Sequence, residues 1–167
     1  MTTGLIIGRF QPFHKGHLHA IEHALKEVDE LIIAVGSSQY VNTEDNPFSV
    51  EERIEMIENT LAKENIGNCA IFPVPDIGDD SEWVEHVEVL VPKFDVVFSG
   101  NDFVMKLFKK SGYNVRKVAF LEGVNGTDVR DKIIKNHEWR ELVPEEAAEV
   151  IDKVKGIKRI KKIFSRK

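Results

Sequence analysis

The segment Leu5-Ile6-Ile7-Gly8-Arg9-Phe10-Gln11-Pro12-Phe13-His14-Lys15-Gly16-His17 determines the fold that we expect. Residues 5–8 form a short apolar run that ends in glycine, which is typical of a buried strand. From His17 to about Asp29 the apolar residues recur with a helical period, so a helix should follow the strand directly. A buried strand that leads straight into a helix is the unit from which α/β folds are built.

The same alternation continues along the rest of the chain. Further apolar runs predict strands at 31–36, 70–74, 95–100 and 113–119, and Pro73 limits how central the third strand can be. A capping box at residues 49–52 opens a helix through Leu61, and helices are also expected at 81–91, at 102–110, from Thr127 and from Pro144. We therefore predict a single-domain, doubly wound, Rossmann-like parallel sheet of about five strands, with a helical C-terminal segment at about 144–167.

The composition is that of one soluble globular domain. The chain has 167 residues, of which 42% are hydrophobic and 31% charged. No apolar run approaches the roughly 20 residues that span a bilayer. Cys69 is the only cysteine, which excludes an internal disulfide and a cysteine-based zinc site. We expect a cytoplasmic protein without a membrane partner.

The net charge of −5 is unevenly distributed. Residues 153–167 hold 8 of the 23 Lys and Arg and no acidic residue, so residues 1–152 carry 15 basic against 28 acidic residues, a net charge of −13. An acidic body argues against nucleic acid as a partner. The basic tail could meet an anionic surface, but apolar residues recur in it every three positions, from Val154 to Ile163. A terminal helix that packs on the body or on a neighbouring subunit is therefore favoured.

In a doubly wound sheet, ligands bind beyond the carboxyl ends of the strands, so the loop after Gly8 is the first candidate site. His14 and His17 are three residues apart and would share one face of a first helical turn, with Gly16 between them leaving room for a ligand. Free N–H groups at the helix N-terminus and the neighbouring Arg9 complete a phosphate cradle. The alternative is a metal site that also uses His19 and His23, but no carboxylate or cysteine completes it nearby.

These residues resemble the opening motif of the H-x-G-H nucleotidyltransferases, and the whole chain resembles the archaeal-type nicotinamide-mononucleotide (NMN) adenylyltransferases within them. The resemblance continues, in order, through the segments Asn46-Pro47-Phe48 and Glu52-Arg53-Ile54, Pro73-Val74-Pro75-Asp76-Ile77, Trp83-Val84, Phe94-Asp95-Val96-Val97, Ser99-Gly100-Asn101, Gly126-Thr127-Asp128-Val129-Arg130, Leu142-Val143-Pro144 and Lys155-Gly156-Ile157. It therefore covers essentially the whole chain.

The resemblance implies an ATP site built from two motifs. In the first, Arg9, His14 and His17 would hold the phosphates; the implied set is Gly8, Arg9, Phe10, His14, Gly16 and His17. In the second, Thr127 and Arg130 would grip the β- and γ-phosphates at a helix start, beside Gly126, and Thr127 can also cap that helix. The chain departs from the family here, because Asn125 stands where a serine is usual; an asparagine can also donate to a phosphate, so Asn125 is still expected to belong to the ATP site.

The resemblance also implies an NMN site. Trp83 would stack on the nicotinamide ring, although its spacing equally suits the core face of a helix shared with Val87 and Leu90. Arg53 would reach the NMN phosphate, although an arginine in mid-helix usually belongs to a solvated face. Asn101 and the backbone of Asp76-Ile77 would contact ribose or the carboxamide.

The implied reaction transfers AMP from ATP to NMN, giving NAD and pyrophosphate. The NMN phosphate is already an anion, so it can attack the α-phosphorus in line without a protein base or a covalent intermediate. Mg²⁺ would be coordinated mainly by phosphate oxygens and water. Another acceptor such as phosphopantetheine or flavin mononucleotide, or a non-catalytic nucleotide sensor, remains an alternative. The family further implies a homo-oligomer, with hexamers among its archaeal members.

Overall fold

The protein, described at residues 1–118 and 121–166 by a computed structural model, is built on a five-stranded parallel sheet. The strand order is β3-β2-β1-β4-β5. The strands are β1 (Thr3–Gly8), β2 (Glu30–Val35), β3 (Cys69–Pro73), β4 (Val96–Ser99) and β5 (Asn114–Lys117). The predicted α/β doubly wound sheet is confirmed, and the strand that contains Pro73 lies at an edge as expected.

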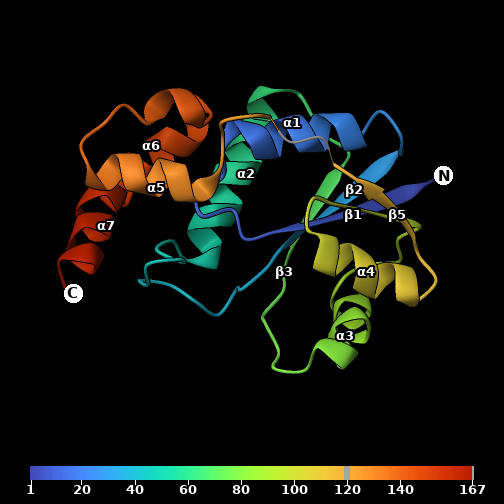
Figure 1. Ribbon diagram of the computed structural model, residues 1–167. Coiled ribbons are helices and arrows are strands. Elements are labelled where there is room, and N and C mark those ends of the chain that lie inside the picture. Colours follow the sequence, from blue (N-terminus) through green and yellow to red (C-terminus); the bar gives the residue numbers. More distant parts are fainter. Residues whose placement is uncertain (119–120, 167) are drawn as a thin grey trace.

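Helices cover both faces of the sheet (Figure 1). They are α1 (Lys15–Ala24), α2 (Val50–Lys63), α3 (Trp83–Leu90), α4 (Asp102–Lys110), α5 (Gly126–Ile134), α6 (Glu145–Lys153) and α7 (Gly156–Ser165), with 3₁₀ turns at Asp80–Glu82 and Arg140–Leu142. One core group packs α1 and α2 against the sheet and continues into α5–α7, which pack on α2 and on one another; a second packs α3 and α4 against the other face. Within the described residues, no helix has the length and apolarity needed to cross a membrane.

The element boundaries differ from the expected ones mainly at the first helix. It begins at Lys15 and ends at Ala24, whereas the apolar spacing predicts a helix from His17 to about Asp29. The chain turns early because the backbone N–H groups of Asp29 and Glu30 donate to the carbonyl of Thr2, which starts β2 beside β1. Val28 still reaches the core from this turn, so its apolar character reflects burial and not helix. Ala119, at the predicted end of the fifth strand, lies outside the described residues.

The prediction of a terminal helix is confirmed for α7. Ile160 is fully buried and Ile163 is 9% exposed, and both lie on the face that packs against the body. The lysines of the same helix lie on its other faces. The basic C-terminal segment therefore has one apolar face that is buried in the core and one charged face that is exposed to solvent.

The strand order places one crevice at the centre of the sheet. β1 pairs with β2 on one side and with β4 on the other, so chain connections leave β1 in opposite directions. Ligands of doubly wound sheets bind at such a switch point, beyond the carboxyl ends of the strands. The segments that follow β1, β2 and β4 meet there, and so does the start of α5.

Candidate functional site

Two histidines cap the helix that begins beyond β1. The Nδ1 atom of His14 accepts hydrogen bonds from the backbone N–H groups of Gly16 at 3.1 Å and His17 at 3.3 Å. The Nδ1 atom of His17 accepts one from the backbone N–H of His14 at 3.1 Å, so the two rings form a reciprocal capping box. Because Nδ1 is an acceptor in both rings, each neutral ring carries its proton on Nε2. Both side chains are thus hydrogen-bond donors at Nε2.

The two rings are also held in the neutral form. They stack with centroids 3.5 Å apart. Burial lowers the pKa of His14 to about 4. Burial, together with the neighbouring His14, lowers the pKa of His17 well below its ordinary value. Near pH 7 the free pair therefore offers donors without charge, and any positive charge for an anion must come from elsewhere.

Gly16 is required by the packing of this pair. A Cβ atom at position 16 would lie 2.9 Å from Cε1 of the His14 ring. The sequence suggests that Gly16 lets a ligand approach closely, and the structure shows that Gly16 also leaves room for the His14 ring.

The ring of His17 is enclosed by two aromatic side chains. The ring centroids of Phe10 and Phe13 lie 4.6 Å and 5.6 Å from that of His17. The histidine positions are therefore fixed by backbone and apolar contacts.

Arg130 supplies charge from the other predicted phosphate motif. Its side chain is buried, Nη1 donates to the carbonyl of Gln11 at 2.7 Å, and Nη2 donates to Oγ1 of Thr127 at 3.3 Å. The fold thus brings together two motifs that the sequence separates by 119 residues. Gly126 permits this contact, because a Cβ there would lie 3.2 Å from both Arg130 Nη1 and the Gln11 carbonyl oxygen.

Arg9 extends the same positive region. It is exposed, and its charge lowers the pKa of Arg130, second to the effect of burial. It lowers the pKa of Arg53 in the same way. Three arginines therefore lie within electrostatic reach of one another at the carboxyl end of β1, which is an arrangement that favours an anion between them.

The cap of α5 differs from the expected one. The N-cap is Asn125, whose Oδ1 accepts from the backbone N–H of Asp128 at 2.8 Å, so the prediction that Thr127 caps this helix is wrong. The Asn125 amide nitrogen donates to the Asp128 carboxylate at 2.9 Å. Asn125 replaces the usual serine as a cap, because an Asn carbonyl serves the same N–H groups. Its amide is not directed to a free position.

Arg53 lies in the interior. It is fully buried, and it donates to the carbonyl oxygens of Ser49 at 3.2 Å, Arg9 at 2.8 Å, Gly36 at 2.8 Å and Ser37 at 3.2 Å. A solvated helix face is therefore the wrong interpretation of this residue. Burial lowers its pKa to about 10. Its guanidinium ties α2 to the loops after β1 and β2, and its bonds go to the backbone.

The loops after β2 and β3 are joined at Asp76. The Ser37 hydroxyl donates to the Asp76 carboxylate at 2.7 Å. The Gln39 side chain brackets the Asp76 backbone, donating to its carbonyl at 3.1 Å and accepting from its N–H at 3.0 Å. Asp76 is exposed and Ile77 half-buried, so this joined edge borders solvent beside the crevice.

Trp83 is the first residue of α3 and is half-buried. It packs against the core group that includes Val84 and Val87, and its ring lies 5.6 Å from that of His86. Leu90 is 38% exposed, so the expectation that it shares the core face is wrong. Trp83 thus has one packed side and one side open to a ligand.

Asn101 caps α4. Its Oδ1 accepts from the backbone N–H groups of Phe103 at 2.9 Å and Val104 at 3.2 Å. The side-chain oxygen is therefore occupied, and only the amide nitrogen is left for a ligand.

Two residues at the site are not identified by the sequence reasoning. Gln11 is buried and exchanges two hydrogen bonds of 2.9 Å with the backbone of Phe48. A polar glutamine between Phe10 and Pro12 is the one feature of the sequence that could have indicated this role. The carboxylate of Asp45 lies 3.9 Å from Nη2 of Arg130. No pattern marks Asp45, because it stands in a polar loop among other polar residues.

No side-chain cluster suited to a metal ion is found in the part of the chain that the structure describes. Groups of three or more His, Cys, Asp or Glu in ligand geometry are absent there. His19 and His23 lie with ring centroids 4.0 Å apart, and Nδ1 of His23 meets the carbonyl of His19.

Comparisons with known proteins identify the family of the chain. Residues 5–144 match the family model of the cytidylyltransferase-like proteins. The nicotinamide-nucleotide adenylyltransferase of Methanococcus aeolicus is 46% identical over 161 residues, covering 95% of this chain and 93% of that protein. The protein of the same name from Saccharolobus solfataricus is 46% identical over 167 residues, covering 98% of this chain and 97% of the relative.

A solved structure shares the fold. The bifunctional NMN adenylyltransferase/ADP ribose pyrophosphatase of Francisella tularensis, in complex with AMP and a manganese ion, superposes with a TM-score of 0.71 at 28% identity. The match covers 85% of this chain but only 44% of that longer protein. By sequence and fold, the chain belongs to the cytidylyltransferase-like family and, within it, to the family of the archaeal nicotinamide-nucleotide adenylyltransferases.

Proposed function

We propose that this protein is a nicotinamide-nucleotide adenylyltransferase, which transfers AMP from ATP to NMN and releases pyrophosphate. The observation that carries the proposal is the meeting of the histidine capping box with Arg9 and Arg130 at the carboxyl end of β1. Two neutral Nε2 donors and two guanidinium groups suit a triphosphate, which is large, anionic and rich in acceptors. We propose that residues 1–167 act as one nucleotidyltransferase domain.

On the ATP side, His14 and His17 would donate from Nε2 to the phosphates, and Arg9 and Arg130 would neutralise them. Thr127 would assist from the start of α5, where backbone N–H groups favour an anion. Gly8, Gly16 and Gly126 would act through shape, because a Cβ at each would lie 2.9–3.2 Å from a neighbouring group. Phe10 would hold the ring of His17, whose centroid lies 4.6 Å from its own. Asn125 would act as the helix cap and not as a phosphate ligand.

On the NMN side, the open face of Trp83 would stack on the cationic nicotinamide ring. The Asp76-Ile77 backbone and the Asn101 amide would bind the carboxamide and ribose. For Arg53 we propose a positioning role, because its hydrogen bonds hold the carbonyls of Arg9 and Ser37 from within the core.

The chemistry requires no nucleophile from the chain. An oxygen of the NMN phosphate forms a bond to the α-phosphorus of ATP as the bond to the bridging oxygen breaks, and the electron pair leaves with pyrophosphate. The donors and guanidinium groups would stabilise the charge that develops on the phosphates, and the fixed loops would align the two substrates.

We infer the role of the divalent metal and the cellular location from the two proposed substrates. The described residues offer no ready side-chain cluster for Mg²⁺, so it would enter as part of MgATP, held by phosphate oxygens and water. We place the reaction in the cytoplasm, where both substrates are available. The homo-oligomer, a hexamer by family resemblance, stays a prediction.

The test is product formation from ATP, Mg²⁺ and NMN, with NAD read by a coupled dehydrogenase. We expect NAD, and no adenylylated product when phosphopantetheine or flavin mononucleotide replaces NMN. ATP binding without NAD would contradict the proposal and favour a nucleotide sensor. An adenylylated product with another acceptor would retain the ATP site and reject the NMN site.

Two substitutions separate chemistry from folding. His14→Asn keeps a side-chain oxygen for the cap, and His17→Gln keeps the acceptor that completes a capping box, but both remove the Nε2 donor. We expect kcat to fall by about 10²–10³-fold in each variant, with circular dichroism and Tm close to wild type. Near wild-type kcat in both variants would reject the assigned roles.

A further inference from the structure

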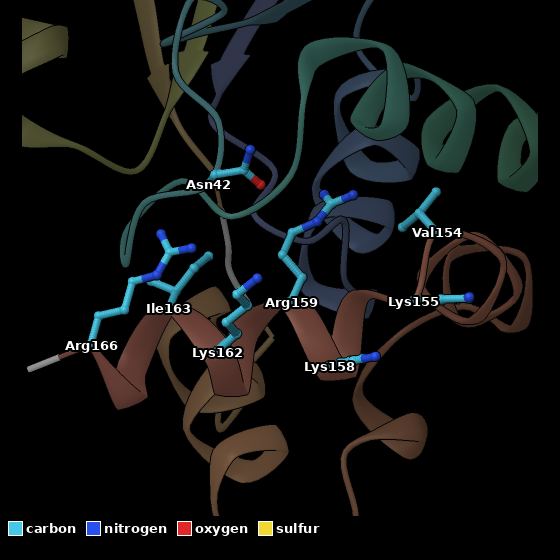
Figure 2. A pocket seen from close by; sticks show the side chains of 8 residues that line it. All are labelled: Asn42, Val154, Lys155, Lys158, Arg159, Lys162, Ile163 and Arg166. Carbon is cyan, nitrogen blue, oxygen red and sulfur yellow. The ribbon is translucent and has the colours of Figure 1, made fainter.

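The solvent face of α7 carries a row of cations that the proposed reaction does not use. They line a groove of about 360 Å³ between this helix and the loop that contains Asn42. Figure 2 shows Arg159, Lys162 and Arg166 extending from α7 toward that loop. The lining residues are Asn42, Val154, Lys155, Lys158, Arg159, Lys162, Ile163 and Arg166, so five carry positive charge and none is acidic.

Most of these cations are uncompensated. Arg159 pairs with the Glu52 carboxylate. Within residues 1–118 and 121–166, the side chains of Lys155, Lys158, Lys162 and Arg166 take part in no ion pair or hydrogen bond. Positions 158, 162 and 166 are four residues apart and lie in one row, where like charges repel. The rest of the chain is strongly acidic, yet four of the five lining cations have no carboxylate partner among the described residues, so the groove suits an external anion.

The groove shares a wall with the phosphate site. Arg159 donates to the carbonyl of Pro47 at 3.1 Å, which holds one side of the loop against α7. On the other side of the same loop, Asp45 lies 3.9 Å from Arg130. A single loop therefore separates the groove from the arginine that would hold the β- and γ-phosphates.

We propose that this groove is a second anion site that binds an oligophosphate, a chain of two or three phosphate groups without a base. Its lining contains no aromatic side chain on which a nucleobase could stack, so single-stranded nucleic acid is disfavoured. Its volume of about 360 Å³ is at the small end of the range for small-molecule sites. Pyrophosphate is an anion of this kind. That the protein itself produces pyrophosphate rests on the proposed function, but the binding of pyrophosphate in the groove does not.

The experiment is titration calorimetry of the full chain with pyrophosphate. The test variant is Lys158→Ala/Lys162→Ala/Arg166→Ala. The matched control is Lys106→Ala/Lys109→Ala/Lys110→Ala on α4, which removes the same charge from other exposed positions. We expect the α7 variant to bind one equivalent less than wild type, or to bind that equivalent about tenfold more weakly, while the control matches wild type.

Equal binding by wild type and the α7 variant would overturn the proposal, and so would the same loss in the α4 control. Tighter binding of a single-stranded oligonucleotide than of tripolyphosphate at equal salt would also overturn it, because the groove would then be a nucleic-acid surface. A change in sedimentation coefficient in the α7 variant with unchanged pyrophosphate binding would identify a contact between copies and reject it.

The result does not depend on catalysis, because the criterion is the difference in binding between wild type and variant. Failure of the proposed function would appear as no NAD from any of the three proteins, with this difference intact. Failure of the groove would appear as equal pyrophosphate binding, with NAD formation intact. We expect the α7 variant to keep the wild-type kcat.

Discussion

At the scale of single residues, Asp45 opposes the proposed function of its neighbour. Its carboxylate is 75% exposed and lies 3.9 Å from the buried guanidinium of Arg130, where an incoming phosphate would place negative charge. We expect Asp45→Asn to lower the KM for ATP by about 1.4- to fivefold, which corresponds to the range of about 0.2–1 kcal/mol for an exposed ion pair. Steady-state kinetics at low salt measure this effect.

The control is Glu58→Gln, which removes one negative charge from an exposed position on α2. It should leave the KM for ATP unchanged. A higher KM in Asp45→Asn would mean that the carboxylate assists substrate binding, and it would reject electrostatic opposition.

The individual residues also indicate what a sequence can and cannot predict. His14, Gly16 and His17 are identifiable because their spacing alone places them at a helix start. For Arg53 the sequence cannot decide between a solvated helix face and contact with the NMN phosphate, because its partners are backbone carbonyls of the loops after β1 and β2, and carbonyls leave no pattern in a sequence. Asp45 is missed for a similar reason, because its proximity to Arg130 depends on loop geometry.

At the scale of elements, Arg53 joins α2 to the loops after β1 and β2. A lysine at this position cannot reproduce the fork of donors, so several buried carbonyls would lose a partner. We expect Arg53→Lys to lower the free energy of unfolding by about 3 kcal/mol, measured by urea denaturation. The KM for NMN, measured where the variant is fully folded, should change little. A large rise in that KM with unchanged stability would instead support direct contact with the NMN phosphate.

The histidine capping box makes the stability of α1 sensitive to acid. The pKa of His14 in the folded chain is about 4, against an ordinary value of 6.5, so the unfolded chain binds the proton more readily. The stabilisation is complete above pH 6.5 and is lost as the pH falls toward 4, with a total of about 3 kcal/mol. Urea denaturation between pH 7 and 4.5 should detect most of this loss.

His14→Asn should reduce that pH dependence without abolishing it, because asparagine keeps the cap and does not titrate, whereas His17, whose pKa is also lowered by burial, remains. His23→Gln is the control, since His23 is exposed on the same helix and its loss should leave the wild-type pH profile. An unchanged profile in His14→Asn would assign the acid sensitivity to other groups.

At the scale of the whole molecule, most of the fold is predictable from the sequence. Five apolar runs and the helices between them are enough to predict the layered α/β architecture, because strands that are buried on both faces require helices on both sides of the sheet. Pro73 even predicts an edge strand correctly. The position of α7 is less accessible, because the partner of a terminal amphipathic helix depends on which surface the other elements leave uncovered. That partner is the α5–α6 side of the molecule, joined to α2 through one ion pair.

The ion pair between Arg159 and Glu52 holds the C-terminal helix α7 against α2. Arg159 donates to both Glu52 oxygens, at 2.6 Å and 2.9 Å, while Glu52 also accepts from the backbone N–H of Ser49 at 2.8 Å. Burial alone would raise the pKa of Glu52, but hydrogen bonds from Arg159 and Ser49 outweigh it and lower that pKa. Because the pKa of Glu52 is lower in the folded chain, its ionised carboxylate stabilises the fold fully at pH values above 4.5, the ordinary pKa of the group. This stabilisation is lost as the pH falls through the lower pKa of the folded chain.

A double-mutant cycle with Glu52→Gln and Arg159→Met isolates the pair, because glutamine still completes the capping box. We expect a coupling of about 1.5–3 kcal/mol at pH 7, falling toward zero in strong acid. The exposed pair of Arg140 and Asp152, whose side chains are 47% and 48% exposed, should couple by less than about 1 kcal/mol. Equal coupling in the two pairs would mean that burial adds nothing, and α7 would then be held by Ile160 and its apolar neighbours alone.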